Sequence, residues 1–204
     1  MSNYHASEMK RTFALCDEHS LTRPTVYQGL YNPLNRRVEQ ELLPLLKANN
    51  CAFVAYNPLA AGLLTGKHKP EGNVQMGRFL ENPNYLPRFY TDKNFEAIDL
   101  IRRACQIDSI TMVEATYTWL MRHSGLTEDD GVLIGASSIA QLEQNLEACT
   151  AASQTNGLSA QLLEAFDEAW QLTEEGAFPY WRSFSSDIPD RDNMDQGATY
   201  AAKK

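Results

Sequence analysis

A run of small residues, glycines and a lysine, AYNPLAAGLLTGK at 55–67, has the composition of a phosphate-binding loop. It overlaps the apolar run CAFVAY (51–56), which predicts a strand buried on both sides, and Asn57-Pro58 then turns the chain. Small side chains let a ligand approach the backbone, and Lys67 offers a positive charge to a phosphate. On these residues alone, a phosphate site and a surface loop with a solvated lysine are both open interpretations.

The loop does not match the pattern of nucleotide hydrolases, G-x-x-x-x-G-K-[ST]. Counting back from Gly66-Lys67, Ala61 stands where the first glycine is required, and His68 stands where the magnesium-binding hydroxyl is required. G-x-G-x-x-G is also absent from the chain. The motif logic therefore argues against ATP hydrolysis.

A second candidate anion site follows the apolar run GVLIGA (131–136), which predicts another buried strand. Ser137 and Ser138 open the next helix, where free backbone N–H groups and the helix dipole favour an anion. Ordinary N-capping by these serines is the alternative interpretation. Two anion sites after consecutive strands predict a nucleotide with more than one phosphate.

Strands alternating with helices predict parallel βα units. Periodicity and capping residues predict strands at 24–28, 51–56 and 131–136 and helices at 7–20, 35–48, 92–105, 111–123, 138–149 and 159–175, with Asn35, Asp92, Thr111, Ser138 and Ser159 as N-caps. Residues 57–91 hold glycines, prolines and aromatics without a clear period, which predicts a long loop, either functional or disordered. A closed (βα)8 barrel takes about 250 residues, so three complete strands predict part of such a barrel.

Composition narrows the function classes. A formal net charge of −8 argues against a nucleic-acid partner, and the absence of an apolar run of about 20 residues argues against a membrane span. The four cysteines form no C-x-x-C pair and the four histidines are scattered, which predicts a cytoplasmic protein without a metal site. Residues 1–182 are predicted to form the barrel part and residues 183–204 a flexible polar tail.

Several motifs together resemble the aldo-keto reductases, in particular the aflatoxin-aldehyde (succinic semialdehyde) reductases. The similar segments are SNY (2–4), PTVYQGLYN (24–32), AYNPLAAGLLTGK (55–67), GRF (77–79), GASSIAQLEQNL (135–146) and PYWR (179–182). The resemblance implies an α/β fold, a (βα)8 TIM barrel that binds NADPH and reduces aldehydes or ketones by hydride transfer. The part represented here would run from the end of the fifth strand through the eighth βα unit and a C-terminal helix.

The resemblance also implies roles for individual residues. The nicotinamide carboxamide would be held by Ser2, Asn3 and Gln28. The pyrophosphate would be wrapped by Asn57, Pro58, Leu59, Ala60, Ala61, Gly62, Leu63, Leu64, Thr65, Gly66 and Lys67, with Arg78 reaching the cofactor phosphates. The adenosine end would be held by Ser137, Ser138, Gln141, Gln144 and Asn145, and the substrate would be contacted by Tyr85, Arg88 and Arg182. Because GASSIAQ lacks the cation with which many relatives bind the 2′-phosphate, a preference for NADPH over NADH rests on Arg78, Lys67 and the subfamily.

The family's catalytic tyrosine, lysine, aspartate and histidine lie in the first half of the barrel. Family members carry G-(L/V/M)-S-N at the end of the fifth strand, and this chain begins MSNY. An N-terminally truncated chain is therefore expected, with no catalytic residue of its own, because the tetrad would lie upstream of Met1. Tyr27, Tyr31 and Tyr56 are interpreted as core or pocket-wall aromatics rather than as substitute acids.

Three hypotheses follow. The first is a shortened NADPH-dependent reductase that acts on a small aldehyde or ketone, in fungal-type secondary metabolism. The second is a non-catalytic nucleotide-binding or accessory half-barrel, which would pair with a second copy or with a full-length relative. The third is an inactive gene remnant.

Overall fold

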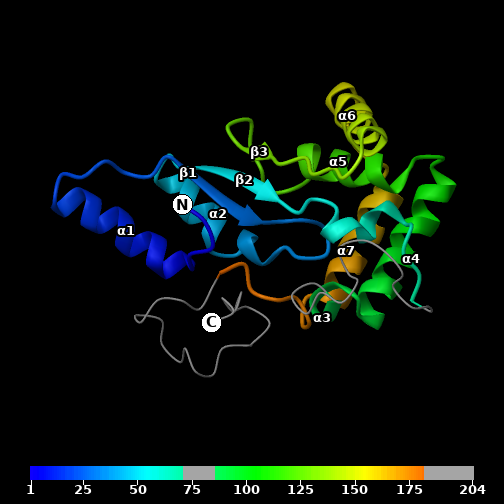
Figure 1. The fold of residues 1–204 in the computed structure, drawn as a ribbon, viewed down its shortest axis with the longest axis horizontal. Helices are drawn as coiled ribbons and strands as arrows, with labels where there is room; N and C mark the ends of the chain where they lie inside the picture. Colours follow the sequence, from blue (N-terminus) through cyan, green and yellow to red (C-terminus); the bar gives the residue numbers. More distant parts are fainter. Residues whose placement is uncertain (71–85, 182–204) are drawn as a thin grey trace.

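A computed structural model describes residues 1–70 and 86–181. Three strands occupy the middle of the molecule, with α1 at one end and α4 and α7 side by side at the other (Figure 1). The elements along the chain are α1 (Ala6–Glu18), β1 (Val26–Leu30), η1 (Arg37–Glu39), α2 (Leu42–Ala48), β2 (Ala52–Tyr56), η2 (Ala60–Thr65), α3 (Leu86–Phe89), α4 (Asp92–Ile107), α5 (Met112–Arg122), β3 (Gly131–Val132), α6 (Ile139–Gln154) and α7 (Ala160–Thr173).

The strands form a parallel sheet in the order β1-β2-β3, which does not close within the described residues. In the register, Val26 pairs with Ala52 and Val54 pairs with Gly131. An isolated parallel bridge joins Ser2 to Gln28 at the outer edge of β1. The prediction of a partial barrel of parallel strands is therefore confirmed.

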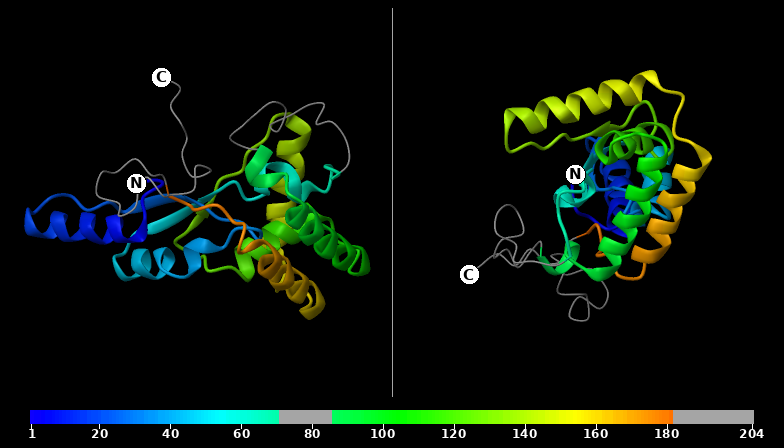
Figure 2. Two further views of the ribbon diagram at one scale, coloured as in Figure 1. Left: turned by 90° about the horizontal axis from the view of Figure 1, so that it is seen from below. Right: turned by 90° about the vertical axis from the view of Figure 1, so that its right-hand side faces the viewer.

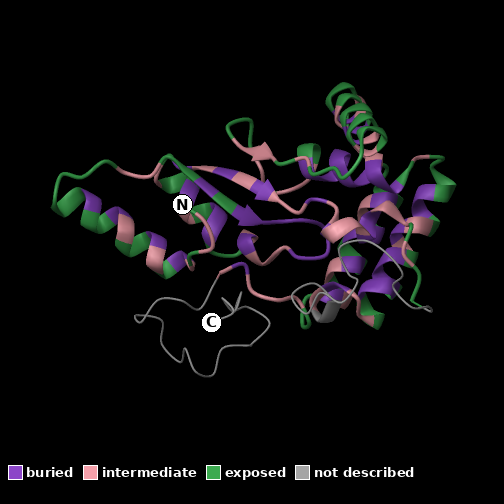
Figure 3. Cartoon of the chain, in the orientation of Figure 1, coloured by how far each residue is buried: buried purple, intermediate pink, exposed green. Residues whose placement is uncertain are grey.

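One face of the sheet is buried and the other is more open (Figure 3). In β2, Phe53 and Ala55 are buried, whereas Ala52, Val54 and Tyr56 are only half-buried. The prediction that this strand is buried on both sides was wrong, because the described helices cover only one face. The prediction for 131–136 was wrong too: regular pairing ends at Val132 and Leu133 is exposed, since β3 has a strand on one side only among the described residues.

A chain of aromatic rings links the sheet to the helices. Tyr27 stacks on Phe53 with ring centroids 5.9 Å apart, and Tyr31 meets Phe53 edge-on at 6.1 Å. Tyr31 also meets Trp119 of α5 at 5.8 Å, and Trp119 lies 6.0 Å from Phe166 of α7. These five rings form the centre of the hydrophobic core, which holds the carboxyl ends of the strands in a fixed position relative to α5 and α7.

Most helices begin where side-chain caps predict. Thr111, Ser138 and Ser159 each accept a hydrogen bond from the backbone N–H three residues on, at 3.1, 3.3 and 3.1 Å respectively. The predicted cap Asp92 is instead the first residue of α4, and Thr91 accepts from Asn94 N at 3.2 Å.

The prediction of a helix at 35–48 was wrong for the first half of that range. After η1, the α-helix begins only at Leu42. Pro44 explains the delay, because its ring clashes with the carbonyl four residues earlier and it donates no hydrogen bond, so it fits only the first turn of a helix. Asn35, the expected cap, is buried and donates from Nδ2 to the Phe178 carbonyl at 2.8 Å.

Helix α6 packs mainly on α5 and projects from the rest of the molecule (Figure 2). Only Asn145, Ala148 and Ala152 are buried along its length. None of the helices in the described ranges is long and apolar enough to cross a membrane.

Candidate functional site

A groove of about 980 Å³ lies at the carboxyl ends of the three strands. Leu30 and Tyr56, the last residues of β1 and β2, line it together with Leu133, which follows β3. Its volume is within the range of cofactor and ligand sites. The groove therefore occupies the end of the sheet where α/β proteins place their ligands.

Asn57 starts the loop that forms one wall of the groove. It has φ 60°, in the left-handed region that asparagine tolerates better than most residues. Its Oδ1 accepts a hydrogen bond from Ala61 N at 2.6 Å, and its carbonyl accepts one from Asn32 Nδ2 at 3.1 Å. One asparagine thus fixes both the loop it begins and the junction between β1 and β2.

The loop continues as η2 with a kink at Ala61 (φ 59°) and Gly62 (φ 103°) and ends at Gly66 (φ 74°). The amide hydrogens of residues 60, 61, 62, 64 and 66 already donate to Asn57, Leu59 or Leu63. Thr65 Oγ1 donates to the Gly62 carbonyl at 2.7 Å. The loop is therefore held by its own hydrogen bonds, and an anion would be bound mainly by side chains beside it.

The charge of the groove is opposite to that of the chain. Lys67, His68 and Arg88 line it, and no Asp or Glu does so among the described residues, although the chain as a whole carries a net charge of −8. Burial, and then the nearby Lys67 ammonium, lower the pKa of His68, so the imidazole is neutral at pH 7. An anionic ligand would meet cationic side chains and no carboxylate in this part of the molecule.

The opposite end of the groove is formed by the segment between β3 and α6. Gln141 Oε1 accepts hydrogen bonds from both the N–H and the hydroxyl of Ser137, each at 2.9 Å. One turn further along α6, buried Asn145 donates from Nδ2 to the Gly135 carbonyl at 3.2 Å. These bonds hold the segment against the helix and turn exposed polar groups toward the groove.

The segment at the N-terminus closes the groove beside β1. Asn3 has φ 59° and donates from Nδ2 to Ser2 Oγ at 2.8 Å, while its Oδ1 accepts from the Tyr56 hydroxyl at 3.0 Å. Ser2 and Gln28 meet in the parallel bridge described above. The three residues expected at the nicotinamide therefore lie together at one edge of the sheet, with Asn3 lining the groove.

Met1 lies against β1 but outside the lining of the groove. Its ammonium donates to the Val26 carbonyl at 2.8 Å, and its own carbonyl accepts from Gln28 N at 2.9 Å. Its side chain is exposed. These backbone bonds hold Met1 at the edge of the sheet, and the placement of the catalytic tetrad upstream of Met1 stays a prediction.

The structure brings most of the expected cofactor residues to this one groove. Those that line it are Asn3, Asn57, Pro58, Leu59, Ala61, Gly62, Thr65, Lys67, Ser137, Gln141, Gln144 and Asn145. Ala60, Leu63 and Leu64 belong to the hydrophobic core, and Ser2, Gln28, Gly66 and Ser138 are not among the lining residues. Of the expected phosphate and substrate residues, Arg88 lines the groove, and Arg78, Tyr85 and Arg182 lie outside the described residues.

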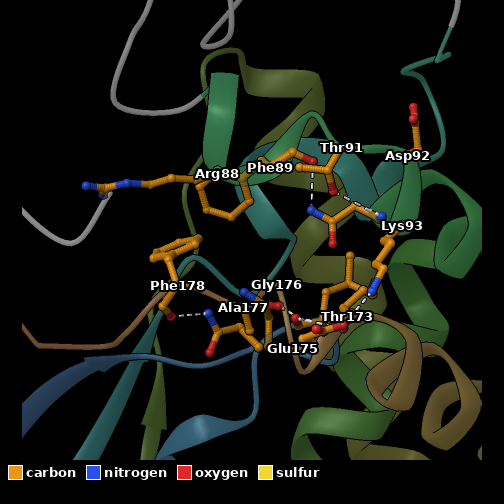
Figure 4. A pocket seen from close by; sticks show the side chains of 14 residues that line it. Arg88, Phe89, Thr91, Asp92, Lys93, Thr173, Glu175, Gly176, Ala177 and Phe178 are labelled. Atoms are coloured by element: carbon orange, nitrogen blue, oxygen red, sulfur yellow. Dashed lines mark hydrogen bonds and ion pairs between the residues drawn. The ribbon is translucent and has the colours of Figure 1, made fainter. Parts of the chain in front are cut away.

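A smaller hollow of about 580 Å³, shown in Figure 4, shares aromatic lining residues with the groove. Phe89 and Phe178 meet edge-on with centroids 5.0 Å apart, and the Arg88 guanidinium lies 5.2 Å from the centre of the Phe178 ring. All three residues line both spaces. Lys93 Nζ and Glu175 Oε2, 2.9 Å apart, join α4 to the segment after α7 beside the smaller hollow. The hydrogen bond and charge of Lys93 lower the pKa of Glu175.

Tyr27 and Tyr31, near the sheet, are not arranged to act as general acids. Tyr27 donates to the Tyr4 carbonyl at 2.7 Å, and Tyr31 donates to the Glu39 carboxylate. Burial raises the pKa of both hydroxyls, and for Tyr31 the Glu39 charge raises it further. Arg36 lies near the Tyr31 hydroxyl, but its guanidinium pairs with the same Glu39 carboxylate, and the pKa of Tyr31 is still raised. Within the described residues, no three His, Cys, Asp or Glu side chains are grouped as metal ligands.

Sequence reasoning did not assign several residues that line the groove, among them Tyr117, Phe178 and Tyr180. Tyr117 lies in the run VEATYTWL of α5, in which nearly every residue is buried, so the sequence pattern indicates only a core position. Tyr180 is buried and accepts a hydrogen bond from Ala6 N at 3.2 Å, which ties the end of the described chain to α1.

The chain is similar in sequence to known proteins over most of its length. The sequence model of the Aldo/keto reductase family matches residues 1–168. Aflatoxin B1 aldehyde reductase member 2 of Mus musculus is 42% identical over 194 residues, covering 89% of this chain and 52% of the mouse protein. Aldo-keto reductase family 7 member A3 of Homo sapiens is 40% identical, covering 89% and 57%, and aldo-keto reductase pigE of Monascus ruber is 31% identical, covering 89% and 55%. The chain spans about half the length of the curated relatives it matches.

Proposed function

Because the chain belongs to the aldo/keto reductase family, we propose that its groove binds NADPH and that it serves in the reduction of an aldehyde or ketone to an alcohol. The observation that carries this proposal is the charge of the groove. A cofactor with several phosphates suits a site lined by Lys67 and Arg88 and without a lining carboxylate among the described residues.

The residues present suit the three parts of the cofactor. The side-chain amide of Asn3 can hold a carboxamide, Lys67 can bind the pyrophosphate, and the segment from Ser137 to Asn145 can hold the adenosine end. When bound, NADPH supplies the hydride that reduces the carbonyl carbon. The chain's own residues orient the cofactor and exclude water from the groove, through aromatic walls that include Tyr180 and Trp181.

Protonation of the reduced carbonyl oxygen requires an acid. Tyr27 and Tyr31 are unsuited to this role, because both hydroxyls already donate to oxygen acceptors and their pKa is raised. We propose that the proton comes instead from the family's tetrad, which the resemblance places upstream of Met1.

The proposed substrate is a small carbonyl compound that carries a carboxylate or another polar group. Arg88 supports this choice, because its position over Phe178 places a guanidinium at the groove wall. Tyr85 and Arg182 remain proposed substrate contacts on the resemblance alone. We also propose a cytoplasmic location and a role in fungal-type secondary metabolism. The first rests on the cysteine pattern and the second on the resemblance.

The test is titration of the 204-residue chain with NADPH and NADH, followed by the fluorescence of the reduced nicotinamide. We expect Lys67→Met to weaken NADPH binding roughly tenfold, since a hydrogen bond to a charged group contributes about 1.5 kcal/mol. Lys47→Met, at the exposed end of α2, is the matched control and should leave the affinity unchanged. If the wild-type chain binds neither nucleotide, the proposed function fails; if it binds both equally, the preference for NADPH fails.

A second candidate function is nucleotide binding without turnover. The bonding of Tyr27 and Tyr31 favours it, because neither hydroxyl is prepared to donate a proton. Adding a small aldehyde and NADPH to a version of the chain with an intact upstream half distinguishes the two functions, because the proposed tetrad lies upstream of Met1. Steady loss of nicotinamide absorbance supports a reductase, whereas stable binding without such loss supports the binding role.

A further inference from the structure

Tyr117 is unusual among the buried tyrosines of this structure. Its side chain is fully buried in α5, and its hydroxyl has no hydrogen-bond partner among the described residues. The hydroxyls of Tyr27, Tyr31 and Tyr180 are each bonded to a named group. Because buried tyrosine hydroxyls nearly always find a partner, the exception needs an explanation.

The position of Tyr117 suggests what the partner is. The residue lines the groove together with Gly135, Ala136, Gln144 and Asn145, so it stands at the end formed by the segment between β3 and α6. Helix α5, which carries it, packs on α6. The nearby Cys149 thiol is one turn beyond Asn145 on the same side of α6, and it does not bond to the hydroxyl.

The chemistry of this end suits a flat nitrogen heterocycle. Gly135 and Ala136 present little side chain, so an aromatic ring can approach the backbone there. Asn145 uses its Nδ2 on the Gly135 carbonyl, which leaves its Oδ1 to accept a hydrogen bond from an amino group. An adenine base offers both an amino donor and ring-nitrogen acceptors. Asn145 can satisfy the amino group, and the ring nitrogens then still require a donor.

We propose that the Tyr117 hydroxyl supplies this donor, by hydrogen-bonding to the adenine base of the bound dinucleotide. The assignment rests on the proposed function, since it presumes that NADPH occupies the groove. The hydroxyl is suited to the role because burial raises its pKa, so it stays protonated and remains a donor at every physiological pH.

The test compares Tyr117→Phe with the wild-type chain for three ligands: NADPH, adenosine 2′,5′-bisphosphate and reduced nicotinamide mononucleotide. We expect the variant to bind the first two roughly three- to tenfold more weakly, as for loss of one neutral hydrogen bond, and to bind the mononucleotide unchanged. Without ligand, the variant should unfold at the same or a higher urea concentration, because the deleted hydroxyl has no partner among the described residues.

Tyr31→Phe is the matched control, because Tyr31 does not line the groove and its hydroxyl is bonded to Glu39 and to Gly125 N. This variant should lose stability and keep its affinity for NADPH. If Tyr117→Phe binds NADPH as the wild-type chain does, or weakens the mononucleotide equally, the assignment is overturned and the proposed function stands. If the wild-type chain does not bind NADPH, the proposed function fails and the assignment fails with it.

Discussion

His123, at the end of α5, holds the segment before α7 through a hydrogen bond that requires a neutral ring. Its Nε2 accepts from Leu158 N at 2.8 Å, so the imidazole at the end of α5 fixes the start of the segment leading to α7. Gly157 has φ 127°, and a Cβ there would lie 2.4 Å from His123 Nε2, so the ring packs directly on the backbone. Burial lowers the pKa of His123 below its ordinary value of 6.5.

This arrangement predicts that stability falls in mild acid. The unfolded chain takes up a proton on His123 near pH 6.5 and the folded chain only at lower pH. The contribution of His123 to the free energy of unfolding is therefore fully present above pH 6.5 and is lost as pH falls through the folded-state pKa. Urea unfolding at about pH 7.5, 6.5 and 5.5 measures the effect.

His123→Gln is the comparison that isolates this titration. Glutamine keeps an acceptor for Leu158 N but does not titrate, so the stability of the variant relative to the wild-type chain should rise as pH falls. A difference between the two proteins that stays constant with pH would contradict the prediction.

At the residue scale, the sequence predicted which residues line the groove better than it predicted their hydrogen-bond partners. The phosphate-loop composition of 55–67 indicated a ligand-binding wall, and its expected lysine does line the groove. The anchoring role of Asn57 and the unpartnered hydroxyl of Tyr117 depend on neighbours that are distant in sequence, Asn32 and the elements around α6. Composition and spacing carry no information about whether such a group is bonded.

At the scale of elements, local signals predicted helix starts better than strand lengths. Ser159 illustrates a strong local signal: its Oγ caps α7 by accepting from Leu162 N and also donates to Asp108 Oδ2 at the end of α4. Strand β3 illustrates the opposite case, because a strand persists only where a neighbour pairs with it, and that neighbour is not specified by GVLIGA itself. The delayed start of α2 follows from Pro44, a local signal that the helical spacing of the neighbouring leucines obscured.

Ser159→Ala tests the capping of α7 directly. We expect a loss of about 1–2 kcal/mol in the free energy of unfolding, because the substitution removes an N-cap and a link between α4 and α7, whose packing forms much of one end of the molecule. Ser153→Ala in exposed α6 is the control, since the Ser153 hydroxyl donates only to the Thr150 carbonyl within its own helix. Equal stability of the two variants, measured by urea unfolding, would show that the cap does not matter.

At the scale of the whole molecule, charge and exposed apolar surface are unevenly distributed. The net charge of −8 does not predict the charge of the groove. Lys67 and Arg88 line the groove, and no carboxylate lines it among the described residues. Helix α6 shows a similar contrast for apolar residues: Ile139 is 77% exposed, Leu142 42% and Leu146 49%, on one side of the helix. Within the described ranges, the edge of β3 is unpaired, and an unpaired edge together with an exposed apolar helix face favours association.

The chain should therefore self-associate as its concentration rises, through the edge of β3 and the exposed face of α6. Replacing Ile139, Leu142 and Leu146 with glutamine should raise the concentration needed for association by more than about tenfold, because each buried side chain contributes about 1 kcal/mol or more to such a contact. Sedimentation velocity over a range of concentrations measures the change. Leu15→Gln with Leu21→Gln, two exposed positions at the α1 end, is the control and should leave association unchanged.

Two outcomes would contradict the prediction that the chain associates through β3 and α6. If the control reduces association as strongly as the α6 variant, the contact lies elsewhere on the molecule. If the wild-type chain stays monomeric throughout, the open edge of β3 is protected by its short length, because the paired stretch Gly131–Val132 offers too few backbone groups to hold a partner strand.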